Sequence, residues 1–249
     1  MEQIVDGLGK IVEGINSVDA AIDSNRVNEI IYIEINSKSS KLTSLIHKAE
    51  NKNIKIREVK NKKDWEFTSR HSVVAFCNPI LTYKESDISK FKDSNFIVCD
   101  HIQDTNNLGA VVRSAAAFGF NVLALPVKRS VKLSNRIFSI SSGGLEHVNI
   151  LMYNSIFSLI KKLNNLDIWT VGLDMDGDVR IDDIDFNQQN IAIFLGSEEK
   201  GISQEVKNKL NVISNIQMLN NTESLNVSIA GAIATVSYTH LTLPTKRIV

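Results

Sequence analysis

The chain has little of several features that mark particular classes of protein. Its 249 residues include only two cysteines, Cys77 and Cys99, and no CxxC or Cys/His spacing suited to zinc, which argues against a disulfide framework and a zinc module. Both cysteines lie in apolar runs and are expected to be reduced core thiols. No apolar run approaches the ~18 residues that a membrane span needs, and residues 1–10 lack the apolar region of a signal peptide. We therefore expect a cytoplasmic protein with no membrane partner.

The chain also lacks an excess of either charge. Lysine plus arginine and aspartate plus glutamate number 28 each, so a nucleic-acid partner would have to be bound by a local basic patch. The histidines at 47, 71, 101 and 147 form no pair at helical spacing. The acidic run 174–178 has its glycine two positions early for a calcium loop. No metal site is predicted.

What is present is a globular composition, 43% hydrophobic and 22% charged, with two successive patterns. Residues 1–79 alternate helix-like and strand-like stretches, which predicts a small α/β domain. Residues 80–94 contain scattered charge and little apolar period, and are expected to form a linker. In the first domain we expect helices at 17–23 and 40–51 and strands at 29–35, 54–59 and 73–77.

Residues 95–237 carry short β-rich runs separated by helical patterns, which is typical of an α/β domain with a largely parallel sheet covered on both faces. The expected strands are 95–100, 121–125, 148–151, 168–173 and 191–195. The run 238–245 is rich in β-branched residues and includes Pro244, which stops helices. We expect residues 238–249 to be a non-native tail that replaces a C-terminal helix.

In the second domain, three segments each follow an apolar strand-like run and open a helix-like one. They are residues 107–113 (NLGAVVR), 196–201 (GSEEKG) and 224–230 (SLNVSIA). An open α/β sheet binds its ligands at the carboxyl ends of its strands, so segments at strand ends are expected to meet there. The three segments together predict one ligand site.

Each segment offers specific groups and also a plain structural interpretation. Asn107 opens a helix whose free N–H groups favour an anionic ligand, and Arg113 lies one turn past Gly109. Gly196 permits close approach of the backbone to a flat ligand, and Glu198 can accept hydrogen bonds from a ribose, an amine or an arginine. Ser224 and Asn226 can cap a helix or contact a ligand. Alternatively, Asn107 is only a cap, Arg113 is a solvated side chain and 196–201 is an ordinary turn.

These segments resemble the three motifs of the SpoU (TrmH-type) branch of the SPOUT RNA 2′-O-methyltransferases. The third segment is close to the S-L-N-V-S pattern of that family, and the resemblance continues through residues 128–133 (KRSVKL) and 143–146 (GGLE). Residues 13–18 (EGINSV) and 70–75 (RHSVVA) are similar to the substrate-binding module of the bacterial 23S rRNA (guanosine-2′-O-)-methyltransferases. The family usually has Asp-Pro where this chain has Asp104-Thr105.

The resemblance implies a fold. The catalytic domain would be a parallel-sheet α/β domain with a deep trefoil knot, preceded by a small α/β domain that is ribosomal-protein L30e-like. Members of this family are homodimers whose active sites lie near the subunit interface.

The resemblance also implies an enzyme and its cofactor, S-adenosylmethionine. The enzyme would methylate a ribose 2′-hydroxyl, most closely a guanosine of large-subunit (23S) ribosomal RNA. Cofactor contacts would come from Gly196, Ile216, Met218, Leu225 and Asn226.

The implied catalytic residues are Arg113, Asn107, Glu198, Ser224 and Asn226. The family match makes Arg113 the group that removes the hydroxyl proton or stabilises the alkoxide, and these two roles stay open. RNA would be bound by a basic cluster of Arg113, Lys128, Arg129, Lys132 and Arg136, for which a solvated lysine-rich face is the alternative.

Two further functions remain open. The same fold could serve a tRNA ribose 2′-O-methyltransferase, although the N-terminal domain is less typical of that group. A non-catalytic RNA-binding assembly factor on this fold is the other alternative.

Overall fold

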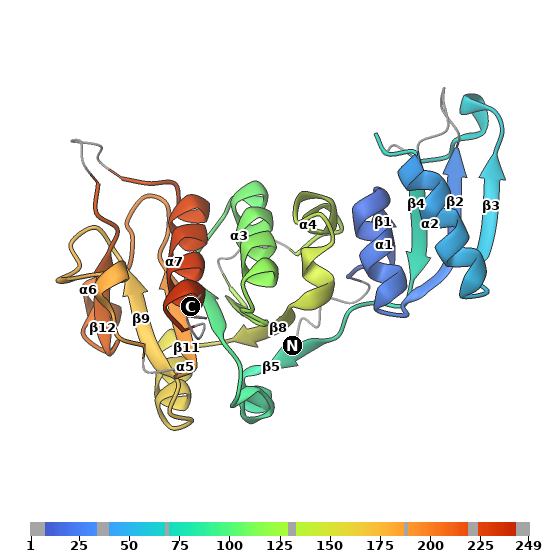
Figure 1. Ribbon diagram of the computed structural model, residues 1–249. Helices are drawn as coiled ribbons and strands as arrows, with labels where there is room; N and C mark the ends of the chain where they lie inside the picture. Colours follow the sequence, from blue (N-terminus) through green and yellow to red (C-terminus); the bar gives the residue numbers. More distant parts are fainter. Residues whose placement is uncertain are drawn as a thin grey trace, which may run out of the picture. The chain divides into compact units, whose positions relative to one another are not determined.

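The computed structural model describes residues 8–33, 40–67, 70–128, 133–186, 189–218 and 224–242. The chain divides into two compact units, one made of Met1–Leu81 and Lys132–His147 and the other of Thr82–Val131 and Val148–Val249. Each unit is built on its own sheet (Figure 1).

The first unit contains a four-stranded sheet in the order β1-β4-β2-β3. β2 and β3 are parallel, while β4 is antiparallel to both β1 and β2. Helix α2 places Leu42, Leu45 and Ala49 at helical spacing on its buried face, as the sequence pattern predicts. The elements are β1 (Ile11–Glu13), α1 (Ile15–Asp23), β2 (Val27–Ile33), α2 (Ser40–Asn51), β3 (Lys55–Val59), the 3₁₀ helix η1 (Lys62–Asp64) and β4 (Val73–Cys77).

A segment from the middle of the chain completes this unit. It contains α4 (Arg136–Ile140) and the 3₁₀ helix η3 (Gly144–His147). The Ser17 hydroxyl donates to the carbonyl of Phe138 at 2.9 Å, and Arg26 Nε donates to Glu146 Oε2 at 2.8 Å. Since the Glu146 side chain is 1% exposed, this ion pair is part of the interior of the unit.

The second unit contains an eight-stranded sheet in the order β10-β12-β9-β11-β6-β7-β8-β5. Every strand pair in it is parallel, which confirms the predicted parallel sheet. The central strands β6, β7 and β11 are buried along their whole length, as strands covered on both faces must be. The strands are β5 (Thr82–Lys84), β6 (Phe96–Cys99), β7 (Val122–Pro126), β8 (Asn149–Tyr153), β9 (Trp169–Leu173), β10 (Val179–Arg180), β11 (Ile191–Leu195) and β12 (Val212–Asn215).

Helices cover both faces of this sheet. α3 and α7 pack side by side on one face, and α5 lies on the other (Figure 1). On the α5 side, Phe96, Val98 and Phe194 from the strands share one apolar core with Leu159 and Leu163 of α5. The helices are α3 (Thr105–Ala117), α5 (Ile156–Asn164), α6 (Gln204–Lys207) and α7 (Val227–Thr242), with the 3₁₀ helices η2 (Glu85–Phe91) and η4 (Ile181–Asp183).

Residues 80–94, expected to form a linker, carry secondary structure. They contain β5, which pairs with β8 at the edge of the sheet, and η2. Glu85 at the start of η2 is 7% exposed and accepts hydrogen bonds from Asn154 N, Ser158 Oγ and Lys162 Nζ. Burial acts to raise the pKa of Glu85, but the hydrogen bonds from these partners outweigh it and hold that pKa below its ordinary value. The strand thus attaches this segment to β8, and the buried carboxylate attaches it to α5.

The last helix continues past Ser237 into the expected tail. α7 ends at Thr242, and residues 243–249, with Pro244, lie outside the described residues. The Thr239 and Thr242 hydroxyls donate to carbonyls four residues earlier, at 2.8 Å each, which gives these β-branched side chains a partner within the helix. Tyr238 is buried against Phe120 and Phe186.

The described helices include none long and apolar enough to cross a membrane. Cys77 and Cys99 are free and buried, as expected. Burial raises the pKa of the Cys77 thiol to about 11 and also raises that of Cys99. Both thiols therefore stay protonated and unreactive at neutral pH.

Candidate active site

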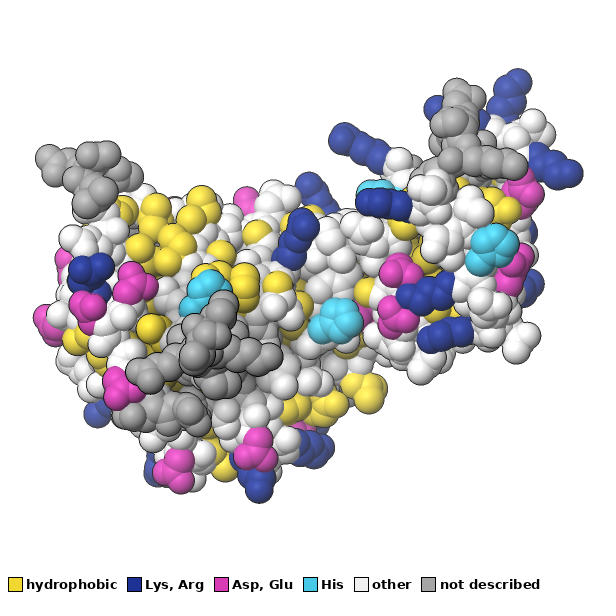
Figure 2. Space-filling view, viewed as in Figure 1, with side chains coloured by type: hydrophobic (Ala, Val, Ile, Leu, Met, Phe, Trp, Pro, Cys, Tyr) yellow, Lys and Arg dark blue, Asp and Glu magenta, His cyan; other side chains and the backbone are white. Residues whose placement is uncertain are grey.

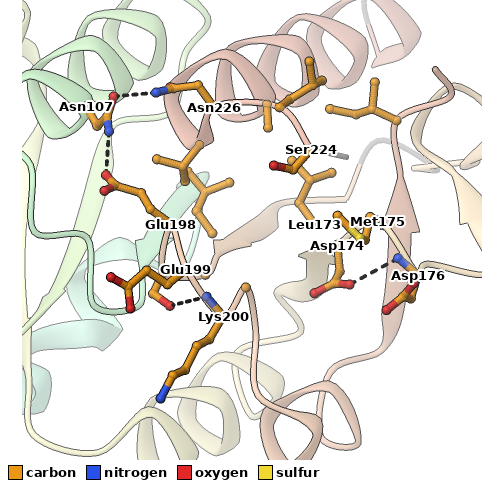
Figure 3. Close-up of a pocket in the computed structure, with 18 of the residues that line it drawn as sticks. Asn107, Leu173, Asp174, Met175, Asp176, Glu198, Glu199, Lys200, Ser224 and Asn226 are labelled. Atoms are coloured by element: carbon orange, nitrogen blue, oxygen red, sulfur yellow. Dashed lines mark hydrogen bonds between the residues drawn. The ribbon is translucent and has the colours of Figure 1, made fainter. Parts of the chain in front are cut away.

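A cavity of about 510 Å³ lies in the second unit, where β9 and β11 end (Figure 3). Its size is that of a pocket for a small organic ligand. β12, β9 and β11 are neighbours in the parallel sheet, so the segments that follow them meet at one edge. The cavity is lined by residues 173–176, 195–201 and 224–227, with Asn107, Lys207, Ile216, Met218 and Ala230.

A chain of side-chain hydrogen bonds joins the three predicted segments on one side of this cavity. Asn226 Nδ2 donates to Asn107 Oδ1 at 3.0 Å, and Asn107 Nδ2 donates to Glu198 Oε1. Asn226 Oδ1 in turn accepts from the backbone N–H of Ser228 at 2.8 Å. These bonds fix the orientation of both amides, because each oxygen accepts and each nitrogen donates.

Asn107 is free for this role because another residue caps α3. Asp104 is the N-cap, and its carboxylate accepts from the backbone N–H groups of Asn106 and Asn107. The interpretation of Asn107 as only a helix cap is therefore wrong. Its side chain instead lies beside the cavity (Figure 3).

Glycine at 196 allows another segment to approach closely, but that segment is the protein backbone at Gly201 and not a ligand. A Cβ atom at this position would lie 2.1 Å from the carbonyl carbon of Gly201. Ser197 and Gly201 exchange two backbone hydrogen bonds of 3.1 and 2.9 Å, and Gly201 has a φ of +61°. The segment 197–201 is thus a closed turn that only glycine at 196 permits, and Glu198 projects from it toward Asn107.

The predicted cofactor positions all line the cavity. Ile216, Met218 and Leu225 contribute apolar surface, while Gly196 and Asn226 contribute small or polar groups. Ser224, predicted as a catalytic residue, also lines the cavity. The structure also adds a wall that the sequence did not predict, formed by Leu173, Asp174, Met175 and Asp176 after β9. Figure 3 shows this wall opposite Asn107, Asn226 and Glu198. The sequence did not show that β9 lies next to β11, and this neighbouring position is what brings residues 173–176 to the cavity.

Arg113 is not brought to the cavity of its own chain. It is exposed on α3 and is absent from the lining residues of the described part of the chain. Glu198, which could have oriented Arg113, accepts from Asn107 instead. To act in this cavity, the Arg113 guanidinium would have to come from another copy of the chain, or it would have to move from the position described.

The predicted basic cluster is described only in part. Lys128 follows β7 and Arg136 opens α4, and both are exposed. Arg129 and Lys132 lie outside the described residues. On the face drawn in Figure 2, lysine and arginine side chains are more frequent over the first unit than over the second.

Two family models match the chain. Residues 11–80 match the model described as "RNA 2'-O ribose methyltransferase substrate binding". Residues 94–236 match the model described as "SpoU rRNA Methylase family". Together they cover the cavity and every strand of both sheets except β5.

Individual proteins align over nearly the whole length. The 23S rRNA (guanosine-2'-O-)-methyltransferase RlmB of Xylella fastidiosa (strain Temecula1) is 29% identical over 232 residues, which cover 89% of this chain and 92% of that protein. A protein of Staphylococcus saprophyticus named for the TrmH family of tRNA/rRNA methyltransferases is 28% identical, with 94% of each chain covered.

A solved structure shares the fold. The SpoU methyltransferase AviRb from Streptomyces viridochromogenes, in complex with the cofactor AdoMet, has a TM-score of 0.75 at 18% identity. The match covers 96% of this chain and 93% of that one.

Proposed function

Since the chain belongs to the SpoU rRNA methylase family, we propose that it methylates the ribose 2′-hydroxyl of a guanosine in large-subunit (23S) ribosomal RNA. It is an RNA 2′-O-ribose methyltransferase that uses S-adenosylmethionine. The observation that carries the proposal is the cavity in which Asn107, Glu198 and Asn226, from three separate segments, are hydrogen-bonded to one another. The choice of a guanosine is supported by the name of the Xylella relative.

The residues present fit the cofactor. The cavity of about 510 Å³ combines an apolar surface for a flat ring with polar groups for a ribose and an amino acid. The turn closed at Gly196 leaves its backbone open to a ligand on the cavity side. When bound, S-adenosylmethionine supplies an electrophilic methyl group. Gly196, Ile216, Met218, Leu225 and Asn226 would hold it.

The attacking group is a ribose hydroxyl, which is a poor nucleophile at neutral pH. The site must accept its proton or stabilise the oxyanion that forms. We propose that Glu198, held at Oε1 by Asn107, orients the hydroxyl through its other oxygen. Asn107 and Asn226 keep that carboxylate in place, and Ser224 completes the wall on the RNA side.

We propose that Arg113 stabilises the developing alkoxide, and that it reaches the cavity of a second copy of the chain. Its exposure outside its own cavity supports a homodimer with active sites near the interface. Ile229 on α7 is 52% exposed, and Figure 2 shows apolar side chains gathered over α7. An apolar patch of this kind supports an interface.

We propose a trefoil knot in the second unit. β12 lies on the far side of β9 from β11, yet α7, which follows β12, packs against α3, which follows β6. Between β12 and α7 the chain must therefore cross the carboxyl ends of β9 and β11, and this crossing supports a threaded topology. For the first unit we propose the L30e-like fold. We also propose a role in binding RNA, supported by the match to the substrate-binding family model and by the lysine and arginine side chains that Figure 2 shows over this unit, among acidic ones.

The domain boundaries also remain proposals. They are 1–79 for substrate binding, 80–94 as the connecting segment that contains β5 and η2, 95–237 for catalysis and 238–249 as a non-native tail whose first residues continue α7. The family matches at 11–80 and 94–236 support the first and third. For RNA we propose contacts from Lys128, Arg129, Lys132 and Arg136, and we propose action in the cytoplasm, where ribosomal RNA is assembled into particles.

The test is methyl transfer to defined RNA. The purified chain is incubated with methyl-labelled S-adenosylmethionine and unmodified 23S ribosomal RNA, and the label is mapped to one nucleotide. Label at a guanosine 2′-oxygen is expected. Label in tRNA instead would favour the tRNA enzyme, an alternative supported by the name of the Staphylococcus relative. RNA binding without any transfer would favour an assembly factor.

A further inference from the structure

One buried carboxylate connects two walls of the cavity. Asp174 comes directly after β9, and its side chain is 8% exposed. Its Oδ1 accepts from the backbone N–H of Asp176 at 3.2 Å, and its Oδ2 accepts from that of Ile202 at 3.4 Å. Asp176 belongs to the wall after β9, while Ile202 ends the turn that carries Glu198.

The same carboxylate lies against the closed turn itself. A Cβ atom at Gly201 would lie 3.0 Å from Asp174 Oδ2, so the turn packs directly on this oxygen. Ile202 is buried in the core of the sheet, which anchors the far end of the turn. Asp174 is therefore the group that attaches the Glu198 turn to the end of β9.

Lys207 supplies the compensating charge. Its Nζ lies 2.7 Å from Asp174 Oδ1, and the lysine side chain is 15% exposed. Lys207 is the last residue of α6, whose neighbouring residue Val206 is buried in the core. Ser203 caps this short helix through the Val206 N–H. A carboxylate at this depth needs such a partner, because an unpaired buried charge is strongly unfavourable.

We propose that Asp174, neutralised by Lys207, is a positioning residue that holds the 197–202 turn in the shape that binds the cofactor. This inference rests on the proposed use of S-adenosylmethionine in this cavity. Both carboxylate oxygens are used, by two different backbone donors. Asparagine would offer one acceptor oxygen and would turn its NH₂ group toward the second donor. The geometry thus requires aspartate at 174.

Isothermal titration with S-adenosylmethionine, without RNA, tests the proposal. We expect Asp174→Asn to weaken binding about tenfold, the effect of one charged hydrogen bond, and Lys207→Gln to weaken it by a smaller factor. The double variant should be no weaker than Asp174→Asn alone, because both changes act on one pair. Asp178→Asn and Lys209→Gln, exposed neighbours outside the cavity, should bind as the wild type does.

Trypsin cleavage after Lys200 gives a readout that does not depend on the ligand. If Asp174 fastens the turn, Asp174→Asn should be cut there several times faster than the wild type, while Asp178→Asn should not. Mass spectrometry of the 1–200 and 201–249 fragments measures this. Kinetics should show a raised KM for S-adenosylmethionine with kcat little changed.

The two proposals fail in different ways. A wild type that does not bind S-adenosylmethionine overturns the cofactor assignment, and the cleavage rates still test the fastening. A wild type that binds, with Asp174→Asn equal to it in affinity and in cleavage, overturns the positioning role. Should Asp174→Asn fail to fold, Lys207→Gln, which keeps the carboxylate, decides by the same two measurements.

Discussion

The side-chain amide of Asn107 donates a hydrogen bond to Glu198, a residue 91 positions later in the chain. Asn107 lies in the first turn of α3, and Glu198 lies in the turn after β11. β6 and β11 are paired in the sheet, so the segments that follow them start side by side. The contact shows that the first and second predicted segments form one site, which Asn226 extends to the third.

Replacing Asn107 by aspartate should separate these segments. In Asn107→Asp the donor to Glu198 is lost and two carboxylates face each other, so the turn should move away. We expect methyl transfer to fall about a hundredfold, as for a small misplacement of a catalytic group. Initial rates with saturating RNA measure this. Asn106→Asp puts the same charge on the same turn of α3 but outside the cavity, and equal losses in the two variants would contradict the assigned role of Asn107.

Adding one methyl group at Gly196 should close the site. The new Cβ in Gly196→Ala would collide with the Gly201 backbone at 2.1 Å, and because its nearest neighbours are backbone atoms of Gly201 and Ile202, no flexible side chain can move aside. We expect loss of S-adenosylmethionine binding and a lowered Tm. Gly119→Ala is the comparison, because its φ of +76° imposes strain of ~1–2 kcal/mol while its Cβ meets nothing within 4 Å. If cofactor affinity falls equally in both variants, the loss comes from lowered stability in general and not from closure of the site at Gly196.

Arg113 should act across a dimer interface. Arg113→Ala should lower kcat by about a hundredfold, since it removes a group that stabilises charge in the transition state, and should leave cofactor affinity unchanged. Arg180→Ala, an exposed arginine outside the cavity, is the matched control.

Mixing variants identifies which subunit supplies the arginine. Co-expressed Arg113→Ala and Asn107→Asp chains should regain about a quarter of wild-type activity, because half of the dimers then hold one intact site. A mixture that stays as inactive as its components would place Arg113 and Asn107 of the same chain in one site.

Periodicity allowed much of the fold to be predicted. The helix at 40–51 and the strands at 73–77 and 191–195 agree with the structure, because their apolar residues recur at helical or continuous-strand spacing. β1, β5, β10 and β12 were missed, and β1 has only three residues. β10 has two residues, β5 reads Thr-Tyr-Lys, and β12 ends in Ser214 and Asn215, so none shows an apolar pattern. These segments form strands because a neighbouring strand offers backbone hydrogen bonds. The local sequence pattern carries no information about that neighbour.

The site was predictable to a similar degree. Residues 107, 198 and 226 were expected to meet because they follow strands of one parallel sheet. Asp174 was not recognised, since its run of acids was judged against a calcium loop, and Lys207 lies in a helix of four residues, too short to show a period. Their ion pair depends on the tertiary structure, which brings the end of α6 close to the residue that follows β9. The exposure of Arg113 likewise follows from the packing of α3 and not from its spacing to Gly109.

The buried carboxylate of Glu85 should make stability depend on acid pH. Its pKa is held below the ordinary value of 4.5, because the hydrogen bonds from Ser158, Lys162 and Asn154 outweigh the effect of burial. A lowered pKa in the folded state stabilises the protein above the unfolded-state value, and this contribution disappears as pH falls through the folded value. At neutral pH, Glu85→Gln should lower the free energy of unfolding by about 2 kcal/mol, the magnitude of a charged hydrogen bond.

Urea unfolding at pH 7 and at successive values below 4.5 measures the difference in unfolding free energy between wild type and Glu85→Gln, which should shrink toward the acid end. Asp87→Asn is the control, because the half-buried Asp87 carboxylate pairs with the exposed Lys90, and surface pairs of this kind contribute little. A difference for Glu85→Gln that stays constant with pH would mean that the variant acts by packing and not through the charge of Glu85.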